Sequence, residues 1–118
     1  MADSVLDARV RDEGGVAVVD LRGRIDGSAR PVLDRAYADA RASGGHEVVL
    51  DLARVDFINS TGVSILVKLV ARARDDAVRL HACGLTDYYR EVFQITGLDP
   101  RIAVHPDLAS AIAAARAG

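Results

Sequence analysis

The stretch Val55-Asp56-Phe57-Ile58-Asn59-Ser60-Thr61-Gly62-Val63-Ser64-Ile65-Leu66 decides how the rest of the chain is organised. The apolar run before it, Val48 to Leu52, predicts a central strand that is covered on both faces. After a short hydrophobic turn, apolar residues at helical spacing predict a helix from Val63 to about Arg74. Side-chain oxygens, such as those of residues 59–61, are favoured at a helix start because the first N–H groups of a helix lack partners. The same N–H groups and the helix dipole favour a phosphate there.

Two strands and a helix are expected before this stretch. Weak alternation over Val5 to Arg11 predicts an edge strand, Gly14-Gly15 predicts a turn, and Val16 to Leu21 predicts a second strand. Because the turn is short, the two strands should form an antiparallel hairpin. Apolar residues at helical spacing between about Ser28 and Ser43 then predict an amphipathic helix.

Two helices and two strands are expected after it. Alternation over Val78 to Cys83 predicts a strand. A short helix capped by Thr86 or Asp87 should follow and end at Thr96-Gly97-Leu98, with Gly97 in the left-handed conformation. A brief strand over residues 102–104 and a terminal helix over residues 107–116, packed through Leu108 and Ile112, complete the pattern.

This alternation of strands and helices predicts an α/β fold, because successive parallel strands need helical crossovers. We expect a mixed, mostly parallel sheet of four or five strands, with an N-terminal antiparallel hairpin and about four helices. A length of 118 residues favours a single domain over residues 1–118.

The helix that follows Ser60 is expected to be apolar over most of its circumference. Its polar residues Ser64, Lys68, Arg72 and Asp75 are spaced four, four and three apart, which places them on one narrow strip. Extended back by four residues, the strip reaches Ser60. This arrangement suits a docking surface, although an ordinary solvated helix face has the same pattern.

Composition excludes several classes of function. The net charge is −2, whereas a nucleic-acid-binding domain is usually basic. No apolar run approaches the roughly 20 residues that span a bilayer, and the first residues lack the layout of a signal peptide. We therefore expect a cytoplasmic chain that binds neither nucleic acid nor membrane. The single cysteine, Cys83, excludes an internal disulfide and a Cys-based zinc cluster.

Catalytic and metal sites have little support in the residues. Ser60 does not lie in a nucleophile elbow, because Ile58 stands where that turn needs glycine. The only lysine, Lys68, lies in a predicted helix, whereas a phospho-aspartate receiver domain needs a lysine at the end of a late strand. His81 and Cys83 share a strand face and could share a metal, but a strand histidine beside a buried thiol is the favoured interpretation. We expect no enzymatic activity, no metal and no cofactor.

Three motifs, in this order, resemble the STAS domain of bacterial anti-sigma-factor antagonists. They are Leu21-Arg22-Gly23-Arg24-Ile25-Asp26, similar to the family's Leu-x-Gly-x-Leu-Asp; Asn59-Ser60-Thr61-Gly62 at the strand-to-helix junction; and Val92-Phe93-Gln94-Ile95-Thr96-Gly97-Leu98. The resemblance covers nearly the whole chain, from about Val5 to the terminal helix. Ile25 replaces the family's leucine, and Asn59 replaces the aspartate that often precedes the serine.

The resemblance implies that Ser60 is phosphorylated by a serine kinase that is itself the anti-sigma factor, and that a metal-dependent serine phosphatase reverses the reaction. Unphosphorylated protein would bind the kinase and free the sigma factor. The loop carrying Asp26 would lie beside Ser60, and Asp26 and Asp56 would repel the phosphate. The expected partner-binding residues are Arg24, Asp26, Asn59, Ser60, Thr61, Gly62, Ser64, Lys68 and Arg72.

Simpler and different roles remain open. From the residues alone, Ser60 is a helix cap that is never modified. Asp26 or Ser28 likewise caps the helix that is predicted to end near Ser43. Within the STAS resemblance, the alternatives are a non-switching subunit of a transport or stress-signalling complex and a module that binds a small molecule.

Overall fold

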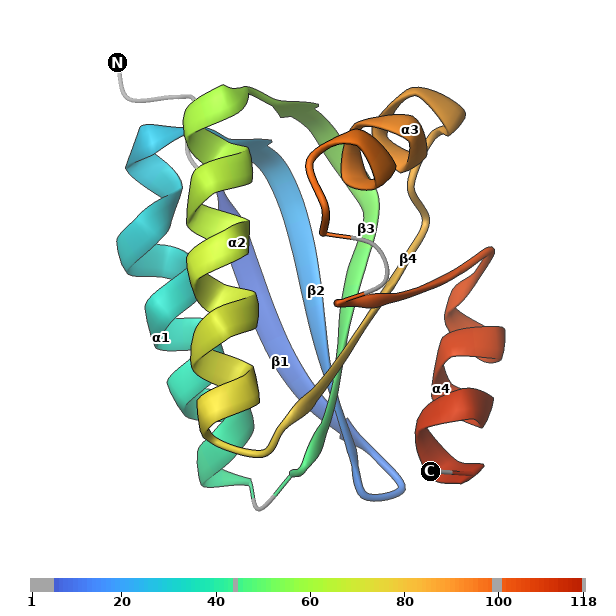
Figure 1. Cartoon of the computed structure of the whole chain (residues 1–118). Helices are drawn as coiled ribbons and strands as arrows, with labels where there is room; N and C mark the ends of the chain where they lie inside the picture. The colour runs from blue at the N-terminus through green and yellow to red at the C-terminus, as the bar shows by residue number, and fades with distance from the viewer. Residues whose placement is uncertain (1–5, 44, 99–100, 118) are drawn as a thin grey trace.

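The computed structural model describes residues 6–43, 45–98 and 101–117 (Figure 1). Strands and helices alternate along the chain in the predicted order, which confirms the α/β fold. Their bounds are β1 (Asp7–Glu13), β2 (Val16–Ile25), α1 (Arg30–Ala42), β3 (Glu47–Ile58), α2 (Ser60–Asp75), β4 (Arg79–Cys83), α3 (Asp87–Ile95), β5 (Ala103–His105) and α4 (Leu108–Ala117), with the short 3₁₀ helix η1 (Gly27–Ala29) before α1.

The five strands form one sheet in the order β1-β2-β3-β4-β5. β1 is antiparallel to β2, and every later pair of neighbours is parallel. The hairpin turn uses Gly14 and Gly15, whose φ angles of 64° and 93° lie in the left-handed region that glycine tolerates. The predicted hairpin and mostly parallel sheet are therefore confirmed, while Val5, the first residue of the expected edge strand, lies outside the described residues.

Helices cover the two faces of the sheet unequally. α1, α2 and α3 pack on one face, and their buried side chains share one core with the strands. α4 packs alone on the other face, against Val16, Val18, Val49 and Cys83 (Figure 1). Because β3 is covered on both sides, its residues 48–52 are all buried, as the unbroken apolar run predicts.

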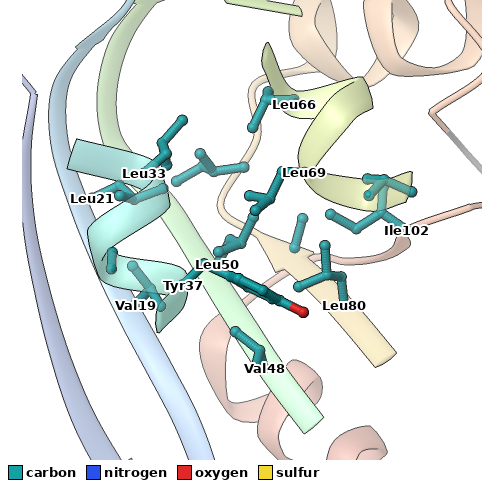
Figure 2. Close-up of a cluster of buried hydrophobic side chains, with 14 of the residues drawn as sticks. Val19, Leu21, Leu33, Tyr37, Val48, Leu50, Leu66, Leu69, Leu80 and Ile102 are labelled. Carbon is teal, nitrogen blue, oxygen red and sulfur yellow. The ribbon is translucent and has the colours of Figure 1, made fainter. Parts of the chain in front are cut away.

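The larger core lies between the sheet and the three-helix layer (Figure 2). Figure 2 shows that side chains from the helices and from the strands meet in this core. The labelled side chains are those of Val19, Leu21, Leu33, Tyr37, Val48, Leu50, Leu66, Leu69, Leu80 and Ile102. α3 reaches this core through Phe93, which is 1% exposed, and its end is closed by Gly97 at a φ of 79°, as predicted. Thr86, one of the two expected caps, accepts a hydrogen bond from Tyr89 N.

Two central strands are longer than the sequence pattern indicates. The segment Val55 to Ile58, expected as a hydrophobic turn, continues β3, and β2 continues to Ile25 instead of ending at Leu21. The two extensions pair with each other, through register shifts, from Arg22 with Arg54 to Ile25 with Ile58. Each segment remains a strand because the other supplies its hydrogen-bonding partner, which the pattern of one segment alone does not reveal.

The last helix also packs differently from the prediction. Its fully buried residues are Ala111 and Ala115, whereas Leu108 and Ile112 are only partly buried beside them. The small alanine side chains let the helix backbone approach the sheet closely. β5 covers residues 103–105 instead of 102–104, and Ile102 belongs to the larger core.

Two buried polar residues on the α4 face, Asp51 and His81, have protein partners. Asp51 Oδ1 accepts hydrogen bonds from Ala53 N and the Cys83 thiol, at 3.1 and 3.8 Å. Burial, followed by the nearby Asp51 carboxylate, raises the pKa of Cys83 to about 12. The two ring nitrogens of His81 lie 2.8 Å from Glu47 Oε1 and 3.1 Å from His105 Nε2. Among the described residues, no group of three or more His, Cys, Asp or Glu side chains could hold a metal ion.

Across residues 6–43, 45–98 and 101–117, no helix combines the length and the apolar character that crossing a bilayer requires.

Phe93→Ala should lower the free energy of unfolding by about 3–5 kcal/mol, because it removes the buried ring that joins α3 to the core. Ile95→Ala in the same helix is the control, since Ile95 is 78% exposed and should change stability by no more than about 0.5 kcal/mol. Urea unfolding followed by circular dichroism measures both. Equal losses for the two variants would contradict this account of how α3 is held.

Candidate functional site at the start of helix α2

The junction between β3 and α2 is capped by Asn59. Its backbone is extended, and its side-chain Oδ1 accepts a hydrogen bond from Gly62 N at 2.8 Å. α2 therefore begins at Ser60, three residues before the Val63 start that apolar spacing indicates. Because Asn59 supplies the capping oxygen, Ser60 is the first helical residue and lies exposed on the surface.

The first turn of α2 lies directly against the end of β2. Asn59 N donates to Ile25 O at 3.3 Å. A Cβ atom built on Gly62 would lie only 1.9 Å from the same carbonyl oxygen. Only glycine fits at this point, so Gly62 determines how closely the helix start approaches the sheet.

The loop that carries Asp26 lies beside this helix start, as the resemblance implies. A Cβ on Gly27 would meet Thr61 Cγ2 at 3.6 Å, an ordinary van der Waals contact. Asp26 itself caps η1, with Oδ1 accepting from Ser28 N at 2.9 Å and from Ser28 Oγ at 2.6 Å. The capping role expected from the residues alone is therefore present, and it holds the loop in place beside Thr61.

Hydrogen bonds from Ser28 and an ion pair with Arg24 compensate the negative charge of Asp26. The hydrogen bonds from Ser28, with a smaller contribution from Arg24, hold the pKa of Asp26 below its usual value. Arg24 Nε lies 3.6 Å from Asp26 Oδ2, and the Arg24 guanidinium stacks on the Phe57 ring at 4.1 Å. The stacking partner Phe57 is not apparent from the sequence, because the register of β2 against β3 brings it there.

The polar residues predicted on α2 are all exposed, namely Ser60, Ser64, Lys68, Arg72 and Asp75. The strip they form is wider than predicted, because Thr61, Val67, Ala71 and Arg74 are exposed as well. α2 buries one side against the sheet and its neighbouring helices, and its buried residues are Gly62, Ile65, Leu66, Leu69, Val70 and Ala73. The helix is amphipathic rather than mostly buried.

Helix α1 extends this surface, which the sequence analysis missed. Arg72 Nη1 lies 3.7 Å from Asp34 Oδ1, and the Arg72 guanidinium lies 4.8 Å from the Tyr37 ring centroid. Arg30, Asp34, Lys68 and Arg72 are among the residues that line a shallow cavity of about 190 Å³ between the two helices. Helical spacing places Arg30 and Asp34 on one face of α1, but only the packing of α1 beside α2 joins them to the strip.

Tyr89 is a further residue that supports this junction. Its hydroxyl oxygen accepts a hydrogen bond from Ile58 N at 2.9 Å. The contact ties α3 to the last residue of β3, immediately before Asn59. Three separate segments, the end of β2, α3 and the Asp26 loop, thus position the strand-to-helix junction.

The chain is similar to known proteins over most of its length. A family model described as Mlab, STAS domain matches residues 8–106. The anti-sigma factor antagonist BtrV of Bordetella bronchiseptica is 31% identical over 103 residues, which cover 87% of this chain and 86% of BtrV. The chain belongs to the STAS-domain family of anti-sigma factor antagonists. Members of this family are regulators rather than enzymes.

Solved structures show the same fold as this STAS domain. The crystal structure of an anti-sigma factor antagonist from Mycobacterium paratuberculosis has a TM-score of 0.80 and 29% identity, covering 98% of this chain and 97% of that chain. The antagonist SpoIIAA in its unphosphorylated form has a TM-score of 0.70 at 17% identity, covering 95% and 99% of the two chains. Its phosphorylated form has a TM-score of 0.62 at 21% identity, covering 84% and 91%. At these identities, the likeness to SpoIIAA concerns the fold alone.

Asn59→Ala should lower the free energy of unfolding of this STAS domain by about 1 kcal/mol, because it leaves Gly62 N without its capping oxygen. Asn59→Asp is the control, since aspartate caps a helix about as well as asparagine. Chemical unfolding compares the two variants with the wild type. A loss as large in the aspartate variant would show that the cap is not the source of the effect.

Gly62→Ala should also destabilise the domain, by about 1–3 kcal/mol, because the new methyl group overlaps the Ile25 carbonyl. At an open helical position the same change would stabilise by up to about 1 kcal/mol. Gly27→Ala adds a methyl group to the facing loop, where the space allows it, and should change stability little. Thermal unfolding distinguishes them, and a stabilised Gly62→Ala protein would contradict the close approach.

Proposed function

We propose that this STAS domain antagonises an anti-sigma factor by partner switching controlled through Ser60. The observation that carries the proposal is the position of Ser60, exposed as the first residue of α2 while Asn59 supplies the cap. A hydroxyl in this position is accessible to a kinase, and its modification leaves the capping bond intact. SpoIIAA, which has the same fold, has been solved in a phosphorylated form.

In the unphosphorylated state, the domain would bind an anti-sigma factor that is also a serine kinase, and thereby free the sigma factor. The proposed docking surface consists of Arg24 and Asp26 in the loop, Asn59, Ser60 and Thr61 at the helix start, and Ser64, Lys68 and Arg72 along α2. Gly62, expected among the partner-binding residues, is buried and supports this surface from beneath. Asp34 of α1 joins this surface through its ion pair with Arg72. The kinase would supply ATP and metal, and a metal-dependent serine phosphatase would restore the docking state.

Phosphorylation of Ser60 should leave the fold intact. A phosphate adds about −1.5 to −2 charges, and the N-terminus of a helix stabilises a nearby anion by roughly 0.3–1 kcal/mol. Asn59 favours this further, because it caps the helix without placing a carboxylate next to the phosphate. The switch then requires no rearrangement of α2.

Loss of binding would arise at the interface. Moving a binding equilibrium from almost complete to almost absent needs about 5.5 kcal/mol, and burying a dianion against a protein partner costs several kcal/mol per ion. Repulsion by Asp26 is smaller than the sequence indicates, because Arg24 lies 3.6 Å from its carboxylate. The main contribution is therefore the desolvation of the phosphate by the docked kinase.

Ser60→Asp should weaken binding to the cognate anti-sigma factor on the order of 100-fold, or about 2.8 kcal/mol, with an unchanged circular dichroism spectrum. Ser60→Ala should bind with wild-type affinity and should persist in the complex when ATP is added. Ala109→Asp is the matched control, because it adds the same charge to the first turn of α4 on the other face of the sheet. Isothermal titration calorimetry measures the three affinities.

Mass spectrometry after incubation with the kinase and ATP locates the phosphate. Phosphate on Ser60 supports the proposal, and phosphate on another residue would refute the site. Stable assembly with a transport ATPase, unaffected by Ser60→Asp, would favour the non-switching subunit instead.

A further inference from the structure

The cavity between α1 and α2 continues the proposed docking surface away from Ser60. It has a volume of about 190 Å³ and is lined by Arg30, Asp34, Ile65, Lys68, Leu69 and Arg72. Lys68 follows Ser60 by eight residues, which is roughly 12 Å along the helix at a rise of about 1.5 Å per residue. A standard interface covers about 800 Å² on each partner, a patch roughly 30 Å across. A protein that docks over Ser60 is therefore wide enough to cover this cavity.

The charged side chains that line this cavity are mostly cationic. Three cations, Arg30, Lys68 and Arg72, share the cavity with one carboxylate, that of Asp34. Arg30 Nε lies 4.0 Å from Asp34 Oδ2, and Arg72 Nη1 lies 3.7 Å from Asp34 Oδ1. None of the ion pairs among the described residues involves Lys68. A chain with a net charge of −2 thus has a local excess of positive charge here.

The ion pairs of Asp34 leave the cations available to a second carboxylate. Both distances are longer than the roughly 2.7–3.2 Å of an N–H···O hydrogen bond. The side chains of Arg30 and Arg72 remain 61% and 48% exposed. The Arg72 guanidinium also lies 4.8 Å from the Tyr37 ring centroid, a cation–π contact that favours its position. Binding to a group held in this way costs less side-chain entropy.

Charge is balanced at the other end of the contact between α1 and α2. There Asp76 Oδ2 accepts a hydrogen bond from the Tyr37 hydroxyl at 2.7 Å, and Arg41 Nη1 lies 3.6 Å from the same oxygen. Arg41 Nη1 also donates to Asp76 O at 3.1 Å. One cation faces one carboxylate at this end, so the excess of positive charge lies at the end nearer Ser60.

We propose that this cavity receives an acidic side chain, an aspartate or a glutamate, of the anti-sigma factor, which rests on the proposed function and adds Arg30 to the contact residues. Guanidinium and ammonium groups bind carboxylates through charge-assisted hydrogen bonds. The volume is below the roughly 300–1,000 Å³ of small-molecule pockets, which favours one side chain over a free ligand. Ile65 and Leu69 give the cavity an apolar base that suits the methylene groups of such a side chain.

Lys68 allows a direct test of this contact, because it is the only lysine of the chain. A carbodiimide joins a carboxylate to an amine as an amide only where the two groups touch. Treatment of the complex with the purified cognate anti-sigma factor should join Lys68 to an aspartate or glutamate of the partner, and mass spectrometry of the digested product locates the link. Lys68→Arg keeps the charge without a reactive amine and should give no such product.

Affinities test whether the cavity contributes to binding. The combined changes Arg30→Gln and Lys68→Gln should weaken binding to the same anti-sigma factor about tenfold. The control changes Arg35→Gln and Arg54→Gln remove the same charge from two exposed residues outside the cavity and should leave the affinity within about twofold. Isothermal titration calorimetry measures both variants, and circular dichroism verifies that they fold.

The outcomes separate this contact from the partner switch. Equal affinities of the two double variants, or a complex that gives no product at Lys68, would overturn the acidic contact, and partner switching would stand if Ser60→Asp still weakens binding. A product at Lys68 in a complex that is insensitive to Ser60→Asp would refute the switch and support the contact. Failure of the wild-type chain to bind the anti-sigma factor at all would refute both.

Discussion

The structure of this STAS domain depends on one close approach, between the first turn of α2 and the carbonyl oxygen of Ile25. Asn59 N donates to that oxygen, and Gly62 leaves the space that the contact needs. The helix start is thereby attached to the end of β2, although β3 is the strand that leads into it. This contact determines the position of the exposed serine and the direction of the helix dipole. It also brings the Asp26 loop against Thr61, so that two segments distant in sequence form one surface.

Parallel pairing of β2 and β3 explains why this surface forms at the carboxyl ends of these two strands. The two strands end side by side at Ile25 and Ile58, and a loop followed by a helix leaves each of them there. The carboxyl ends of parallel strands are a common location for binding sites, because loops and helix N-termini gather at that edge. The site is supported from a third side by Tyr89 of α3. A rigidly held serine suits a switch that acts by charge, since the phosphate changes the surface without moving the helix.

The pattern of apolar residues predicted nearly every helix and strand, because period and turn chemistry are local properties. It failed where a neighbour decided the outcome. The segment Val55 to Ile58 does not by itself favour a strand over a turn, yet it pairs with the end of β2. α4 was expected to pack through Leu108 and Ile112, but Ala111 and Ala115 are the buried residues, because the close packing of a single helix favours small side chains. Arg72 was expected on an exposed strip, and its contacts with Asp34 and Tyr37 depend on where α1 lies.

By itself, the sequence determined the order of strands and helices, the hairpin, the capped junction at Asn59-Ser60 and the family to which the chain belongs. These follow from spacing, from turn residues and from short motifs, which act over a few neighbouring positions. Only the tertiary structure decided which oxygen caps α2, how close Gly62 lies to Ile25 and which charge compensates Asp26. It also placed Arg30 of α1 in one cavity with Lys68 and Arg72 of α2. Such features depend on the register of strands and the packing of helices, which bring together residues that have no periodic relation in the chain.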